Sequence, residues 1–82
     1  MASETQFYLQ FPAEAAAHSA GEQLRGEGFD VQVGPSPYGG DGWNAVARIA
    51  VADADLAGVQ ARLTELAESA GGGLDGYDKL LR

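Results

Sequence analysis

The side chains that could do chemistry in this 82-residue chain are few. Its one histidine, His18, stands beside Ser19, and there is no cysteine. A hydroxyl nucleophile needs a base within hydrogen-bond reach, but neighbouring residues on a helix point about 100° apart. The pair therefore does not predict a nucleophile with its base. We expect His18 at the surface or at a boundary between helix and sheet.

Metal and acid–base chemistry are poorly supported as well. One histidine without cysteine cannot supply a zinc site of known type, and the twelve acidic residues lack the spacing of a calcium loop. The paired carboxylates, Asp53 with Asp55 and Glu65 with Glu68, fit helix capping and a solvated helix face. The sequence predicts no catalytic residue, no metal site and no cofactor, and hence a protein that is not an enzyme.

A glycine-rich stretch, "GPSPYGGDG" at residues 34–42, raises the question of phosphate binding. It lacks the lysine of a phosphate-binding loop and the change from strand to helix that orients such a loop. Its glycines and prolines instead favour a hairpin turn, with Tyr38 as an exposed aromatic.

The charge of the chain indicates what kind of partner it can bind. Twelve acidic residues against five basic ones give a net charge of −7. Phosphate backbones repel such a chain, so we expect no direct contact with nucleic acid. A basic protein partner fits the charge; the simpler alternative is that acidity only keeps the domain soluble. Without a charged leader or a long apolar run, we expect a cytoplasmic protein that does not bind membranes.

Hydrophobic periodicity predicts six elements. Alternation over residues 5–11 buries Phe7, Leu9 and Phe11 on one face of a strand. Gly21 lets the first helix approach the sheet, Gly26 or Gly28 caps its end, and Asp53 caps the start of the second helix. The expected elements are strand 5–11, helix 13–27, strand 29–34, strand 43–51, helix 54–70 and strand 73–80.

This β-α-β-β-α-β order predicts an α+β, ferredoxin-like sandwich that forms one domain over residues 1–82. Four antiparallel strands form the sheet, with strands one and three in the middle, and two helices cover one face. The other face stays open. The residues expected on it are Tyr8, Gln10, Asp30, Gln32, Asn44, Val46 and Arg48.

Aromatic side chains near this open face are the candidates for partner binding, because aromatics are enriched in interface cores. The set is Tyr8, Trp43, Asp75 and Tyr77. Asp75 and Tyr77 belong to an Asp-Gly-Tyr step in the last strand, where Gly76 permits a bulge that re-aims Tyr77. The alternative is that Trp43 and Tyr77 are core residues at the sheet edge.

Two stretches resemble a known family. Residues 63–81, "LTELAESAGGGLDGYDKLL", look like the C-terminal part of the regulator of ribonuclease E activity B family, with tyrosine at position 77 where tryptophan is usual. Residues 15–34, "AAAHSAGEQLRGEGFDVQVG", are similar to the family's first helix and following strand. The resemblance implies a ferredoxin-like inhibitor that binds ribonuclease E by protein–protein contact and lowers or redirects RNA cleavage.

A second hypothesis remains open beside this one. A small ferredoxin-like module can also bind a ligand, or oligomerise by packing two open sheets face to face as a homodimer. Val46 and Tyr8 on the open face are the residues that motivate it.

Overall fold

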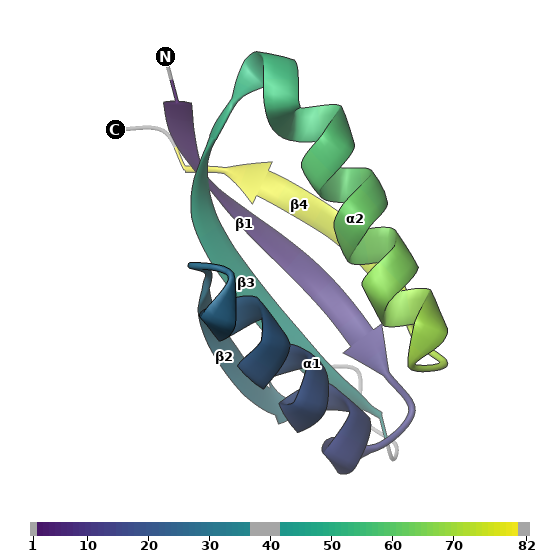
Figure 1. The fold of residues 1–82 in the computed structure, drawn as a ribbon. Coiled ribbons are helices and arrows are strands. Elements are labelled where there is room, and N and C mark those ends of the chain that lie inside the picture. The colour runs from purple at the N-terminus through teal and green to yellow at the C-terminus, as the bar shows by residue number, and fades with distance from the viewer. Residues whose placement is uncertain (1, 37–41, 81–82) are drawn as a thin grey trace.

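The fold is a four-stranded antiparallel sheet with two helices on one face, as a computed structural model of the chain shows (Figure 1). The structure describes residues 2–36 and 42–80. Its elements are β1 (Ala2–Phe11), α1 (Glu14–Gly26), β2 (Asp30–Pro35), β3 (Trp43–Ala52), the 3-10 turn η1 (Asp53–Asp55), α2 (Leu56–Ser69) and β4 (Gly73–Lys79). The strand order β2-β3-β1-β4 places strands one and three in the centre, so the predicted ferredoxin-like class is confirmed.

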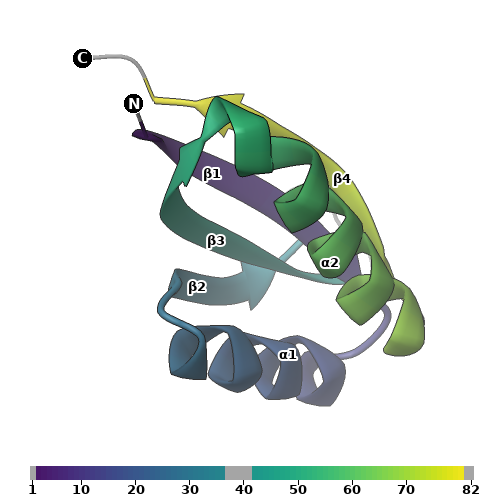
Figure 2. The same ribbon diagram turned by 45° about the horizontal axis from the view of Figure 1, so that its top comes forward.

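The core lies between the sheet and the helices, on the inner face of β1. Phe7, Leu9 and Phe11 are buried there, as their alternation predicts. Small residues surround these large ones: Ala45 lies opposite Leu9 and Ala47 opposite Phe7 on β3. Figure 2 shows both helices on this side of the sheet. The helices add Ala17, Ala20, Leu24, Leu63 and Ala67 to the core.

Both helices end in the same hydrogen-bonded turn. At the end of α1, the backbone N–H of Phe29 donates to Leu24 and that of Gly28 donates to Arg25. Gly28 has φ +98°, and the equivalent residue after α2, Gly71, has φ +85°. Only glycine adopts this left-handed conformation without strain. Gly28, rather than Gly26, is therefore the cap of the first helix.

The start of the second helix differs from the prediction. Asp53 does not cap α2; it lies in η1 and accepts a hydrogen bond from Lys79 Nζ at 2.7 Å. This hydrogen bond, with the charge of the ammonium group, lowers the pKa of Asp53. The 3-10 turn delays the α-helix to Leu56, whose N-cap is Asp55 without a side-chain capping bond.

The other element limits need small corrections. The first strand begins at Ala2, three residues before the prediction, because it pairs with β3 along its whole length. Pro35 ends β2 instead of opening the turn, since it lies on an edge strand where a missing N–H costs no ladder bond. The expected exposed aromatic, Tyr38, lies outside the described residues.

Two glycines allow elements to approach closely. A Cβ on Gly21 of α1 would lie 3.1 Å from Val33 on β2, so this glycine lets the helix sit close to the sheet as predicted. A Cβ on Gly72 would collide with the backbone carbonyl of Gln10 and lie 3.1 Å from the Cα of Phe11. The turn between α2 and β4 therefore rests directly on the end of β1.

We expect Gly72→Ala to destabilise the domain by about 2–3 kcal/mol, because the obstructing atoms are backbone and cannot move aside. Gly73→Ala is the matched control: a Cβ there meets nothing within 4 Å, so its effect stays within about 0.5 kcal/mol. Urea unfolding followed by circular dichroism measures both. Equal losses in the two variants would contradict the close approach at Gly72.

Candidate functional site

The open face of the sheet presents rows of side chains that cross the strands. The strand register places Asp30 on β2 opposite Arg48 on β3, then Gln6 on β1, then Asp78 on β4. Directly opposed residues share a face and lie about 5 Å apart. One row of polar groups thus spans the whole sheet on the side that the helices leave uncovered.

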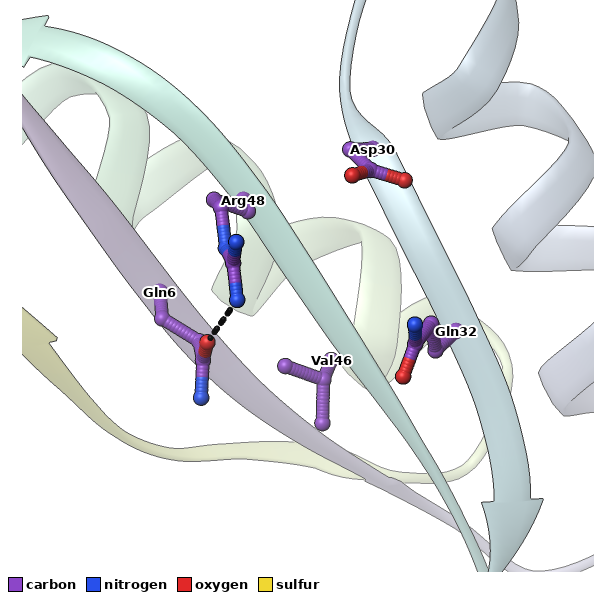
Figure 3. Close-up of a pocket in the computed structure, with 5 residues that line it drawn as sticks. All are labelled: Gln6, Asp30, Gln32, Val46 and Arg48. Atoms are coloured by element: carbon purple, nitrogen blue, oxygen red, sulfur yellow. Dashed lines mark hydrogen bonds between the residues drawn. The ribbon is translucent and has the colours of Figure 1, made fainter.

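Hydrogen bonds join three strands through Tyr8. Arg48 Nη2 donates to Gln6 Oε1 at 2.9 Å (Figure 3), and Gln6 Nε2 donates to the Tyr8 hydroxyl at 2.9 Å. The Tyr8 hydroxyl in turn donates to Asp78 Oδ2 at 2.8 Å. This series of three hydrogen bonds begins at the Arg48 cation and ends at the Asp78 carboxylate, and every donor in it points toward β4 or along the path to it. Tyr8 is held in one orientation as a result.

Asp78 sets the acidity of Tyr8. The hydrogen bond to this carboxylate raises the pKa of the Tyr8 phenol above 10.0, because losing the proton would leave two negative charges in contact. Partial burial raises it further, and the hydrogen bond from Gln6 opposes the shift. Tyr8 is therefore a neutral hydrogen-bond donor at physiological pH and does not serve as a base.

Beside this network lies a hollow of about 270 Å³, lined by Gln6, Asp30, Gln32, Val46 and Arg48. Figure 3 shows the Arg48 side chain directed toward Gln6, while Asp30 stands apart on β2. In the described part of the chain, the Asp30 side chain makes no hydrogen bond or ion pair. Arg48 Nη1 lies 3.9 Å from Glu4 Oε1. The hollow thus has at its β2 margin a carboxylate without a direct ion-pair partner, although Arg48 lies on the neighbouring strand.

The predicted bulge in the last strand is present. The register of β4 against β1 shifts between Tyr8 and Leu9, which leaves Asp75 as the extra residue. Gly76 does not have a positive φ, so the bulge does not require glycine there. Because of the shift, Tyr77 pairs with Phe7 and turns toward the helix side, where the two ring centroids are 5.7 Å apart. Tyr77 remains 36% exposed at the edge.

Trp43 lies away from the open face. It starts β3 opposite the inward-facing Phe11, packs against the core, and has its ring centroid 6.0 Å from that of His18 on α1. His18 itself is about half exposed and lies 3.6 Å from Glu14. His18 is thus at the boundary between helix and sheet, as predicted.

The four candidate contact residues do not form one cluster. Tyr8 is on the open face, Asp75 is in the bulge, and Tyr77 is on the helix side of β4. These three belong to the paired strands β1 and β4 but lie on different sides of the sheet, whereas Trp43 packs beside α1. The sequence did not reveal the link between Tyr8 and Asp78. Alternation alone puts Gln6 and Arg48 on the open face, but the face of Asp78 depends on the bulge.

The charges of the described residues leave the surface negative. All four basic side chains in residues 2–36 and 42–80 already have partners within the chain: Arg25 with the Val31 carbonyl, Arg48 with Gln6, Arg62 with Glu27, and Lys79 with Asp53. Six carboxylates in the same ranges have none: Glu22, Asp30, Asp55, Glu65, Glu68 and Asp75. The folded domain therefore offers negative charge to a partner.

Across the described residues, no three His, Asp or Glu side chains gather in a way that could hold a metal ion. The one histidine faces Trp43 and Glu14 on the helix side, away from the open face. The open face presents hydrogen-bonding side chains, the ring of Tyr8 and carboxylates. No described helix is long and apolar enough to cross a membrane.

We expect Asp78→Asn to lower the pKa of Tyr8 toward its ordinary value, because the variant removes the charge that opposes ionisation. The folded-state pKa is raised, so this contact stabilises the fold fully below pH 10.0 and less as pH rises through that pKa. Tyrosinate absorbance in a background lacking the other two tyrosines, Tyr38 and Tyr77, measures the shift. Asp75→Asn, which removes a nearby carboxylate without touching Tyr8, is the control. An unchanged titration in Asp78→Asn would rule out the contact.

Comparison with known proteins identifies the family. No match was found among curated proteins or solved structures. A family model, described as regulator of ribonuclease activity B, matches residues 2–78, which include every strand and helix up to the next-to-last residue of β4. The match covers the bulge, the Tyr8 network and both helices. The chain therefore belongs to the family of regulators of ribonuclease activity B.

Proposed function

We propose that this protein is a non-catalytic regulator that binds a ribonuclease, of the ribonuclease E kind, and lowers or redirects its cleavage of RNA by protein–protein contact. The observation that carries the proposal is the arrangement of charge. Among the described residues, every cation has a partner inside the chain, whereas six carboxylates have none. A nuclease must carry basic surfaces for RNA, and such surfaces can receive an acidic protein.

The same arrangement argues against direct binding to RNA. Ferredoxin-like RNA-binding domains stack bases on aromatics of the central strands and contact the phosphates with basic residues. Tyr8 offers a ring on a central strand, but Asp78 is hydrogen bonded to it and Asp30 lies in the neighbouring row. Phosphates approaching this ring would meet carboxylates. Regulation through the nuclease is therefore favoured over competition for the RNA.

The proposed contact residues have unequal roles. Tyr8, Asp75 and Tyr77 belong to the paired strands β1 and β4, with Tyr8 on the open face and Tyr77 on the helix side, so a partner that contacts all three must wrap around the β4 edge. Trp43 packs against the core, so its truncation will change stability as well as any contact. Tyr77 and Asp75 are both exposed, and we assign them the direct contacts at the sheet edge.

The alternative is a homodimer in which two open faces pack together. Val46 and Tyr8 near the centre of the open face favour it. Glu4, Asp30 and Asp78 on the same face oppose it, because two copies would bring these carboxylates close to one another. Sedimentation at high protein concentration separates the two proposals: a single monomeric species excludes the dimer.

We expect the purified protein to slow cleavage of a fluorogenic RNA by ribonuclease E, saturably and less strongly as salt rises from about 50 to about 300 mM. Tyr77→Ala and Asp75→Ala should weaken inhibition, whereas Glu22→Ala on α1 serves as a charge-matched control away from β4. RNA anisotropy without the nuclease tests for direct RNA binding. Unchanged cleavage with no complex formed, or tight binding to the RNA alone, would refute the proposal.

A further inference from the structure

The open face contains three glycines that the fold itself does not require. Gly34 on β2 pairs with Asn44, and on β4 Gly73 pairs with Gln10 and Gly76 with Tyr8. None of the three has a positive φ. A Cβ added to any of them would meet nothing within 4 Å. Neither backbone conformation nor packing within the chain explains why these positions lack a side chain.

Glycine in the interior of a strand is unfavourable, and it often marks a place where another backbone approaches closely. The contrast with other glycines is clear: Gly21 and Gly72 have internal neighbours that exclude a side chain, and Gly28 and Gly71 have positive φ. Gly26 and Gly58 also have free space, but they lie on the helices. All three described strand glycines thus lie on the uncovered face.

These glycines shape the open face. One row reads Gly34, Asn44, Gln10 and Gly73 across the four strands, with amides in the centre and no side chain at either edge. The next row reads Gln32, Val46, Tyr8 and Gly76. A peptide of a partner can therefore cross the sheet over the first row without meeting a side chain on either edge strand, β2 or β4. Asn and Gln amides both donate and accept hydrogen bonds, which suits them to contact a peptide backbone.

The charge of this face selects a basic occupant. Glu4, Asp30 and Asp78 are on it and Arg48 is its one described cation, already hydrogen bonded to Gln6. The unpaired Asp30 lines the hollow beside the Val46 side chain, which can contact the aliphatic stem of an arginine or lysine. A second copy of this chain would bring like charges together, so it fits less well than a basic segment.

We infer that the open face is the docking surface for an extended basic segment of a protein partner. The segment's backbone crosses the row from Gly34 to Gly73, and one arginine or lysine side chain enters the hollow and pairs with Asp30. The inference deepens the proposed function and rests on it for the identity of the partner as a ribonuclease. Strands about 4.8 Å apart make the crossing about 14 Å long, which about five extended residues cover.

The test uses the whole protein and a synthetic peptide of about eight residues, rich in arginine, glycine and serine, long enough to make that crossing. In an amide NMR titration, we expect the largest shifts at Gly34, Gly73 and Gly76. Gly34→Val and Gly73→Val put a side chain on the peptide's path and should weaken binding at least about tenfold, equivalent to about 1.4 kcal/mol. Valine suits a strand, so both variants should fold, which circular dichroism verifies.

Gly26→Ala and Gly58→Ala are the matched controls, because each also fills free space but lies on a helix. We expect unchanged peptide affinity in both. Asp30→Asn should weaken binding and reduce its salt dependence, because it removes one charge pair. Shifts confined to the helices, or equal affinity in the strand variants and the helix controls, would overturn the inference. Shifts at the same amides on concentrating the protein alone would assign this face to a second copy instead.

The same variants assayed against ribonuclease E separate the two proposals. Loss of inhibition in Gly34→Val and Gly73→Val supports both. Full inhibition by these variants, with the peptide leaving the open face unshifted, overturns the docking surface and leaves the regulator function standing. If the wild-type protein does not bind ribonuclease E but the peptide binds in a glycine-dependent way, the proposed partner fails and the docking surface stands.

Discussion

The burial of Phe7, Leu9 and Phe11 on one side of β1 is the interaction on which the rest of the structure depends. β1 pairs with both β3 and β4, and its inner side chains lie beneath the helix layer. Burying each such side chain fully contributes about 1.5–3 kcal/mol. These large side chains fit because their neighbours are small: Ala45 and Ala47 lie beside them on β3. An 82-residue chain has little other core, so this strand organises both helices.

The same alternation that buries one side of β1 exposes the other. With both helices on one face (Figure 2), no helix covers the outer side of β1, where alternation places Gln6, Tyr8 and Gln10. On this uncovered face, side-chain hydrogen bonds link β3, β1 and β4 in place of apolar packing. They run from Arg48 through Gln6 and Tyr8 to Asp78. This surface is polar, and its hydrogen bonds hold the side chains in fixed orientations.

The bulge at Asp75 connects the core with the open face. Without an extra residue, Leu74 and Tyr77 would point to opposite sides of β4, since successive side chains alternate. With it, both face the helix layer, and Asp78 turns outward to accept the hydrogen bond of Tyr8. One inserted residue therefore places an aromatic at the core edge and a carboxylate in the polar network, within the region that the family model matches.

The sequence by itself determined the order of the elements, the inward side of the strands and the ferredoxin-like class, because periods of two and of three to four residues are local properties of the chain. It also indicated the bulge and the family. The contact of Asp53 with Lys79, from the far end of the chain, could not be read locally. The faces of Trp43 and Tyr77, the link from Tyr8 to Asp78 and the alignment of Gly34 with Gly73 were decided only by the tertiary structure. Each depends on the register between strands distant in sequence, which a pattern along one strand does not specify.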